Sequence, residues 1–269
     1  MHMRHLLSAL AVCVPLSGMC ETFNAVSSVW SPYIMGTTGK VSGIGYEIFV
    51  EILRRTGDVA TIKILPNKRA LEVFKKGDAD LIILDSPLWA DPQRVKTYAF
   101  SDAFMSTEEY IYFQKDHYID VKSPADLRNK TVDVMRGYYY PAFETAFQTN
   151  QVKKYEVDSE EILLKKLFTK RTDAVFMVSE AFQYTLNGLG YDPSAFKRGI
   201  KLSTTPLSLK IRIEKSNALP RINAAIAAMK KDGTMQRIIQ SYATVTVTHA
   251  PPSADDGQPT CQRSCTSIH

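Results

Sequence analysis

The sequence predicts an α/β fold built from two units of similar plan. Short β-rich runs alternate with helical segments, which is the pattern of α/β domains. The alternation begins again after Asp116, so a second α/β unit follows the first. The chain has 269 residues and is 45% hydrophobic, which is enough to bury a core in one large domain or two small ones.

In the first unit, β-branched and aromatic runs predict strands, and apolar residues on one face predict helices. In the segment 46–55, for example, Ile48, Phe49 and Ile52 share one helical face. The predicted elements are strand 23–29, helix 46–55, strand 61–65, helix 68–76, strand 80–84 and a strand at 110–113.

The second unit is predicted from the same signals. The helix at 160–168 that runs into a strand at 173–176 echoes the earlier helix and strand at 68–84. The sequence between the units is too short and too β-like to be a flexible linker, so we expect crossing strands. The remaining elements are a helix start at 123–126, strand 131–135, helix 141–149, a return strand 207–213, and a long helix 219–242 broken at Asp232-Gly233.

The first twenty residues have the layout of a secretory signal peptide, with a short basic start and an apolar run too short to span a bilayer. Gly18 and Cys20 are the small side chains that signal peptidase reads, so we expect Glu21 to be the first mature residue. A lipid anchor on Cys20 or Cys13 is the alternative. The sequence therefore predicts export to the periplasm through a cleaved signal peptide 1–20.

Residues 246–269 are rich in Thr, Pro, Ser, Asp and Gln and predict a disordered tail. Cys261 and Cys265 lie in it and are the only cysteines left after the leader, so no disulfide framework or cysteine metal site holds the main fold. Whether they pair stays open. The net charge of +5 is spread along the chain, which argues against nucleic-acid binding. We expect a monomer with no metal and no cofactor.

Six short motifs follow one another in order along the chain. They are Trp30-Ser31-Pro32-Tyr33, Gly43-Ile44-Gly45-Tyr46, Gly77-Asp78-Ala79-Asp80, Arg94 eight residues before Asp102, Leu127-Arg128-Asn129-Lys130, and Asp232-Gly233-Thr234-Met235. Together they resemble the family 3 periplasmic solute-binding proteins, the polar amino-acid receptors of ABC importers. The resemblance implies a type II periplasmic binding protein fold, with the ligand between two α/β lobes. Lobe one would comprise 21–112 plus 207–245, and lobe two 113–206.

In lobe one, the resemblance puts Arg94 at the position that binds the ligand carboxylate, for which a guanidinium supplies two parallel donors. A surface arginine beside Asp91 is the alternative. Trp30 is expected to stack on the ligand, with core packing as its other interpretation. Asp85 and Ser86 end a strand, where ligands of α/β sheets tend to bind, although Asp85 would also suit a turn cap.

In lobe two, Arg136, Tyr138 and Tyr139 follow a strand and precede a helix, the place where the resemblance implies contacts to a ligand anion. Bulky tyrosines stand there in place of small hydroxyls. Val178 occupies the position where an amino-acid receptor has an aspartate for the ligand ammonium. Ser179 is a substitute one residue away, although a helix-capping role is its simpler interpretation.

Lobe one also departs from the family pattern, because Asn67 replaces an apolar wall residue and Trp89 replaces a small hydroxyl; we include Asn67 in the candidate site. The sequence predicts a receptor that delivers a small polar, carboxylate-bearing solute, an amino acid or related, to an inner-membrane ABC permease. The alternatives are a ligand sensor for a membrane receptor and a dehydratase-like enzyme with Glu180, Asp85 or Glu144 as its acid. No motif joins these acids to a nucleophile or metal, which favours a non-enzyme.

Overall fold

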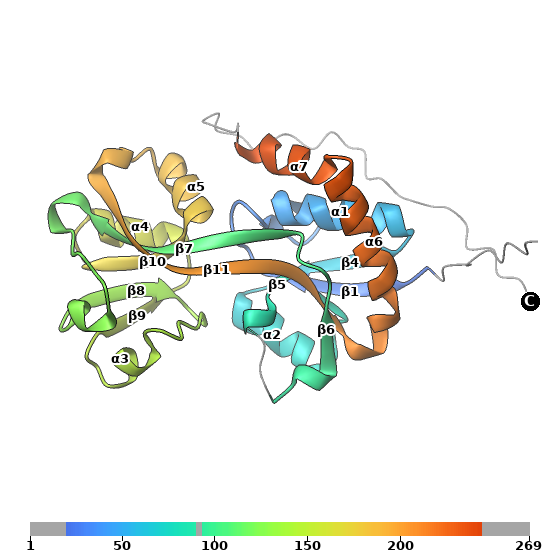
Figure 1. Ribbon diagram of the computed structural model, residues 1–269, viewed down its shortest axis with the longest axis horizontal. Helices are drawn as coiled ribbons and strands as arrows, with labels where there is room; N and C mark the ends of the chain where they lie inside the picture. Colours follow the sequence, from blue (N-terminus) through green and yellow to red (C-terminus); the bar gives the residue numbers. More distant parts are fainter. Residues whose placement is uncertain (1–19, 90–92, 244–269) are drawn as a thin grey trace, which may run out of the picture.

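The computed structural model describes residues 20–89 and 93–243, whose helices and strands form two groups joined by two long strands (Figure 1). These strands are β7 (Met105–Gln114) and β11 (Phe196–Arg212), which pair antiparallel along much of their length. We call the group that contains α1, α2, α6 and α7 lobe 1, and the group that contains α3, α4 and α5 lobe 2. The predicted α/β fold with crossing strands is confirmed.

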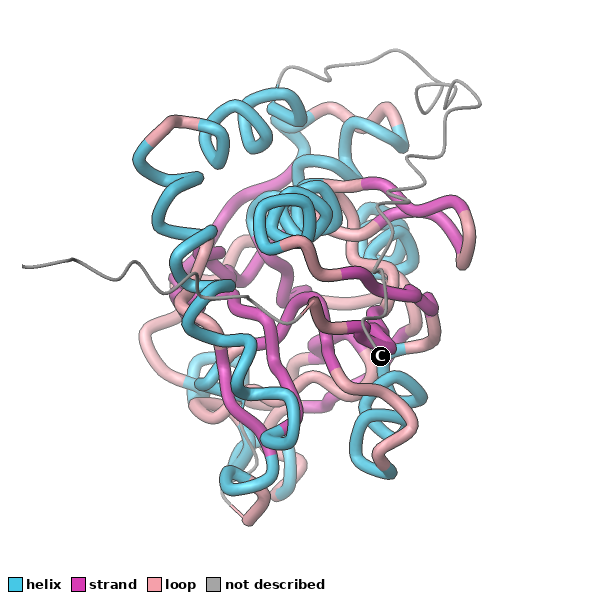
Figure 2. Tube along the Cα trace, turned by 90° about the vertical axis from the view of Figure 1, so that its right-hand side faces the viewer, coloured by secondary structure: helices cyan, strands magenta, loops and turns pink. Residues whose placement is uncertain are grey.

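Lobe 1 has a sheet with helices on both faces (Figures 1 and 2). Its strands follow the order β4-β1-β5-β11, in which β1 runs parallel to β4 and β5 while β11 runs antiparallel to β5. The elements are β1 (Thr22–Ser27), β2 (Met35–Thr37), β3 (Lys40–Ser42), α1 (Ile44–Thr56), β4 (Val59–Ile64), α2 (Asn67–Lys76), β5 (Leu81–Asp85), β6 (Tyr98–Phe100), α6 (Leu219–Lys231) and α7 (Thr234–Ala243), with 3-10 helices η1 (Pro87–Trp89), η2 (Val95–Thr97) and η6 (Ile213–Ala218).

Lobe 2 continues the same sheet in the order β7-β10-β8-β9, with β10 parallel to β8 and antiparallel to β7. Helices α4 and α5 lie on one side of these strands and α3 on the other (Figure 1). The elements are β8 (Thr131–Met135), α3 (Glu144–Gln148), β9 (Lys153–Val157), α4 (Glu160–Phe168), β10 (Ala174–Val178) and α5 (Ser179–Leu189), with 3-10 helices η3 (Lys115–His117), η4 (Pro124–Leu127) and η5 (Pro193–Ala195).

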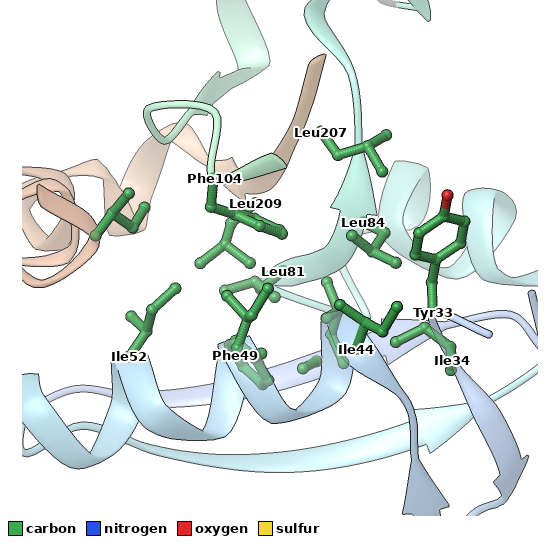
Figure 3. Close-up of a cluster of buried hydrophobic side chains, with 14 of the residues drawn as sticks. Tyr33, Ile34, Ile44, Phe49, Ile52, Leu81, Leu84, Phe104, Leu207 and Leu209 are labelled. Atoms are coloured by element: carbon green, nitrogen blue, oxygen red, sulfur yellow. The ribbon is translucent and has the colours of Figure 1, made fainter. Parts of the chain in front are cut away.

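The core of lobe 1 forms between α1 and the sheet. Phe49 and Ile52 rise from α1 toward Leu81 of β5 and Leu209 of β11, and all four side chains are fully buried (Figure 3). Burying a side chain of this size stabilises the fold by about 1.5–3 kcal/mol. Val178, at the end of β10 in lobe 2, belongs to the same buried cluster. The two lobes are therefore packed against each other where β10 ends.

Several predicted elements differ in length from those of the structure. The helix expected at 141–149 is only Glu144–Gln148, because the chain first makes a turn in which the amide of Phe143 donates to the carbonyl of Tyr140. The return strand expected at 207–213 is the last part of the 17-residue strand β11. Its first half carries Gly199 and mostly polar side chains, so it lacks the apolar run that marks a buried strand.

The predicted signal peptide, apart from Cys20, and the predicted tail with Cys261 and Cys265 lie outside the described residues. Within residues 20–89 and 93–243, no helix combines the length and the apolar composition that crossing a bilayer requires. The same part of the chain holds no cluster of three or more His, Cys, Asp or Glu side chains suited to a metal ion.

Candidate ligand cleft

A cavity of about 580 Å³ lies between the lobes, within the range typical of small-molecule sites. Lobe 1, lobe 2 and both crossing strands contribute to its wall, which is largely apolar and aromatic. The lining residues are Ser27, Ser28, Trp30, Asn67, Ala70, Leu71, Ile82, Leu84, Asp85, Leu88 and Trp89 from lobe 1, Thr107, Glu109, Ser203, Thr205 and Lys210 from the crossing strands, and Gly137, Tyr138, Tyr139, Tyr140 and Val178 from lobe 2.

The lobes approach each other at two places around this cavity. The Nδ2 atom of Asn67 in lobe 1 lies 3.7 Å from where a Cβ atom on Gly137 in lobe 2 would stand. At the second place, the hydroxyl of Thr107 donates to Oε2 of Glu180 at 3.1 Å and shares a 3.0 Å hydrogen bond with the buried hydroxyl of Tyr33. Burial, followed by the charge of Glu180, raises the pKa of Tyr33, so this phenol stays neutral and can donate to Thr107.

Five of the nine predicted site residues line the cavity: Trp30, Asn67, Asp85, Tyr138 and Tyr139. Trp30 is only 6% exposed, and its ring centre lies 4.7 Å from that of Tyr33 and 6.2 Å from that of Trp89. Its ring therefore packs in the core of lobe 1 and also forms part of the cavity wall. Asn67 is the first residue of α2, which sets its side chain at the interlobe contact.

Three predicted residues are engaged elsewhere. Ser86 is fully buried, and its hydroxyl accepts from the amide of Leu88 at 3.3 Å. Arg136 is exposed and donates to Asp158 at 2.7 Å. Ser179 does not cap α5, because Val178 is the N-cap residue and the Ser179 hydroxyl bonds to Glu180 at 2.8 Å. The capping interpretation of Ser179 is therefore wrong.

Arg94 lies in the loop that follows residues 90–92, at the N-cap position of η2. Its side chain is exposed and is not among the described residues that line the cavity. Its carbonyl accepts from the amide and the hydroxyl of Thr97 at 2.9 and 2.8 Å, which fixes the turn. A carboxylate-binding role for Arg94 stays a prediction.

A buried ion pair forms part of the cavity wall in lobe 1. Lys210 Nζ lies 3.1 Å from Asp85 Oδ2, and the two residues are 7% and 5% exposed. The ammonium also lies 4.2 Å from the ring centre of Tyr98 and 5.6 Å from those of Phe74 and Phe100, which are cation–π contacts. Burial raises the pKa of Asp85, while Lys210 acts to lower it.

A second carboxylate, Glu109 of β7, faces the cavity from the crossing strands. Burial raises its pKa to about 7. Ser203 of β11 is its direct cross-strand partner, and the hydroxyl of Tyr140 lies close enough to affect its titration. That hydroxyl is buried and makes no hydrogen bond of normal geometry within the described part of the chain.

Sequence reasoning missed both Glu109 and Lys210. Lys210 is the one charged side chain inside the apolar run 207–211, which is a signal for a buried, paired charge. Glu109 has only a weak signal, because Glu108 stands beside it and strand alternation does not say which of the two points inward.

Two lobes, two crossing strands and a cavity between the lobes define the type II periplasmic binding protein-like class. Residues 24–245 match the bacterial extracellular solute-binding proteins, family 3, and the chain belongs to this family. The predicted family resemblance is confirmed.

Two curated relatives come from Escherichia coli strain K12. ABC transporter arginine-binding protein 1 is 28% identical over 178 residues, covering 63% of this chain and 67% of the relative. L-cystine-binding protein TcyJ is 24% identical over 218 residues, covering 79% and 78%. Among solved structures, an ancestral arginine-binding protein bound to arginine superposes with a TM-score of 0.69 at 22% identity, covering 82% of this chain and 97% of that one. This likeness confirms the shared fold.

Proposed function

We propose that this chain captures an amino acid or a related carboxylate-bearing solute in the periplasm and delivers it to an inner-membrane ABC permease. The observation that carries the proposal is the cavity of about 580 Å³ that is lined by both lobes and both crossing strands. Hinge motion through such strands lets two lobes close around a small solute. The arginine- and cystine-binding relatives support an amino acid as the solute class.

The proposal excludes chemistry on the solute. Of the three acids considered for a dehydratase-like enzyme, Asp85 lines the cavity but is paired with Lys210. Glu180 is engaged by Thr107 and Ser179, and Glu144 accepts from the amide of Tyr140. A bound solute that is recovered unchanged by NMR after prolonged incubation with the protein supports binding alone, and conversion of the solute supports the enzyme.

The second part of the proposal concerns the membrane protein on which the solute-bound chain docks. A permease and an ATPase encoded beside this gene would support import. A lone histidine kinase encoded there would support the alternative, in which the protein docks on a membrane receptor as a ligand sensor.

The predicted carboxylate contact is tested with Arg94→Ala. A charge-assisted hydrogen bond contributes about 1.5–3 kcal/mol, so we expect affinity for L-arginine to fall by about 10- to 100-fold. Agmatine, which lacks the carboxylate, should bind both proteins equally. Arg94→Lys should recover part of the loss, because an ammonium keeps the charge but not the paired donors. Isothermal titration calorimetry measures each affinity.

Equal affinity of the wild type and Arg94→Ala for every carboxylate-bearing probe would remove Arg94 from the site. The proposal that the cavity binds a carboxylate would then depend on Lys210, the cation that lines it among the described residues. If L-arginine, L-glutamine, L-cystine and the other natural amino acids all fail to bind the wild type, the proposed solute class is wrong.

A further inference from the structure

Three polar groups converge on one side of the interlobe cavity. Glu109 of β7 and Ser203 of β11 are paired across the crossing strands, and Tyr140 reaches them from the loop after β8. All three residues line the cavity. Tyr140 is 4% exposed, and its hydroxyl lacks a hydrogen-bond partner of normal geometry in the described part of the chain. A buried polar atom left this way is an opening for a ligand group.

The carboxylate of Glu109 has no cationic partner within the described residues. On β10, its cross-strand neighbour is the apolar Val178. On β11, Lys201 is 2.9 Å from Glu108 instead. Lys210, which also lines the cavity, is held by Asp85. The charges of that pair cancel, so Glu109 leaves one unbalanced negative charge on the cavity wall when it is ionised.

The surroundings of this carboxylate favour a cation in two further ways. Burial raises the pKa of the neighbouring Tyr138, and the charges of Glu160, at the start of α4, and of Glu109 raise it further, so the charge near this side is negative. The wall also carries the rings of Trp30, Trp89 and Tyr139, and aromatic faces attract ammonium and guanidinium groups. Lys210, which is held by Asp85, is the one cation among the described residues that line the cavity.

We propose that Glu109, together with the hydroxyls of Tyr140 and Ser203, binds a cationic group of the solute, an ammonium or a guanidinium. The inference rests on the proposed function, because it names the second charged group of the solute held in the same cavity. It assigns the cation to the crossing strands and lobe 2, on the side of the cavity away from the Asp85–Lys210 pair.

Binding of a cation beside Glu109 must then be coupled to loss of a proton. The pKa of Glu109 is raised to about 7 by burial, and a bound positive charge lowers it. Affinity for a cationic solute should therefore rise about tenfold per pH unit from pH 5 to pH 7, as the carboxylate ionises, and level off above pH 8. An anionic solute would show the opposite trend.

The test is isothermal titration calorimetry from pH 5.5 to 8.5, in two buffers of different ionisation enthalpy, with L-arginine, agmatine, putrescine and succinate as probes. For an amine-bearing probe that binds at pH 7, we expect release of about half a proton, since a group with a pKa of about 7 is half protonated there. Glu109→Gln should abolish both the proton release and the pH slope. It should also weaken binding by at least tenfold at pH 8.

Glu108→Gln is the matched control, because Glu108 is the next residue of β7 and bonds to Lys201 and Tyr110 instead. It should keep the proton release and the slope of the wild type. Thermal unfolding without probe shows that both variants fold. Because Gln has nearly the shape of Glu, a change confined to proton release cannot come from altered packing.

Two outcomes would overturn this inference and leave the proposed function standing. In one, an amine-bearing probe binds Glu109→Gln with the proton release of the wild type. In the other, succinate binds while the cations fail, and its affinity falls as the pH rises through 7. If none of the four probes nor any natural amino acid binds the wild type, the proposed function fails and the inference falls with it.

Discussion

Lys210→Met should lower the free energy of unfolding by about 3–5 kcal/mol at pH 8, the typical cost of removing one partner from a buried ion pair. Asp85, only 5% exposed, then loses its ion-pair partner and keeps the 2.7 Å hydrogen bond from the amide of Ser86. Chemical denaturation followed by circular dichroism measures the change.

The loss should shrink as the pH falls. Burial raises the pKa of Asp85, so the folded state of the variant binds more protons than the unfolded state and gains stability as this carboxyl is protonated. The double variant Asp85→Asn/Lys210→Met removes the buried charge and should recover most of the stability at pH 8. A decrease of less than about 1 kcal/mol in the free energy of unfolding of Lys210→Met would show that water reaches the Asp85–Lys210 pair.

Ser28→Trp should abolish binding, with affinity for any probe reduced by more than about 100-fold. Ser28 follows β1 and lines the cavity, so an indole there would occupy the space of the solute and overpack the closed form. Binding is measured by calorimetry, and thermal unfolding without probe should change little, because the partly buried Ser28 borders the cavity.

The neighbouring residue, Val29, supplies the control for the Ser28→Trp substitution. Val29 is 51% exposed and does not line the cavity, so Val29→Trp adds the same ring one position away and should bind as the wild type does. If Ser28→Trp binds normally, the solute lies somewhere other than this cavity.

The parts of the fold that could be predicted are those whose apolar pattern and end signals lie within the segment itself. Helix α4 and strand β8 have the predicted bounds 160–168 and 131–135. In α4, three fully buried leucines share one face and the hydroxyl of Ser159 accepts from the amide of Ile162, which caps the first turn. In β8, Val132 and Val134 alternate onto one face and are fully buried in the core of lobe 2.

The candidate site was less predictable, because its residues meet through tertiary pairing. Val178 showed that the expected acid is missing, but the sequence cannot show that Glu109 is paired opposite it in the sheet. The Asp85–Lys210 pair joins positions 125 residues apart. Trp30 was the easier prediction. It belongs to the motif Trp30-Ser31-Pro32-Tyr33, which follows closely after the end of β1 in lobe 1, and it lines the cavity as predicted.

Titration of intrinsic tryptophan fluorescence tests the central claim, capture of an amino-acid-like solute between the lobes, most directly. Trp30 and Trp89 are the two tryptophans of the chain, and both line the cavity. A saturable, one-to-one change in emission, with the affinity found by calorimetry and reduced in Trp89→Phe, is the result that we predict. A solute that binds by calorimetry yet leaves the emission of both tryptophans unchanged would place its site elsewhere and contradict the account.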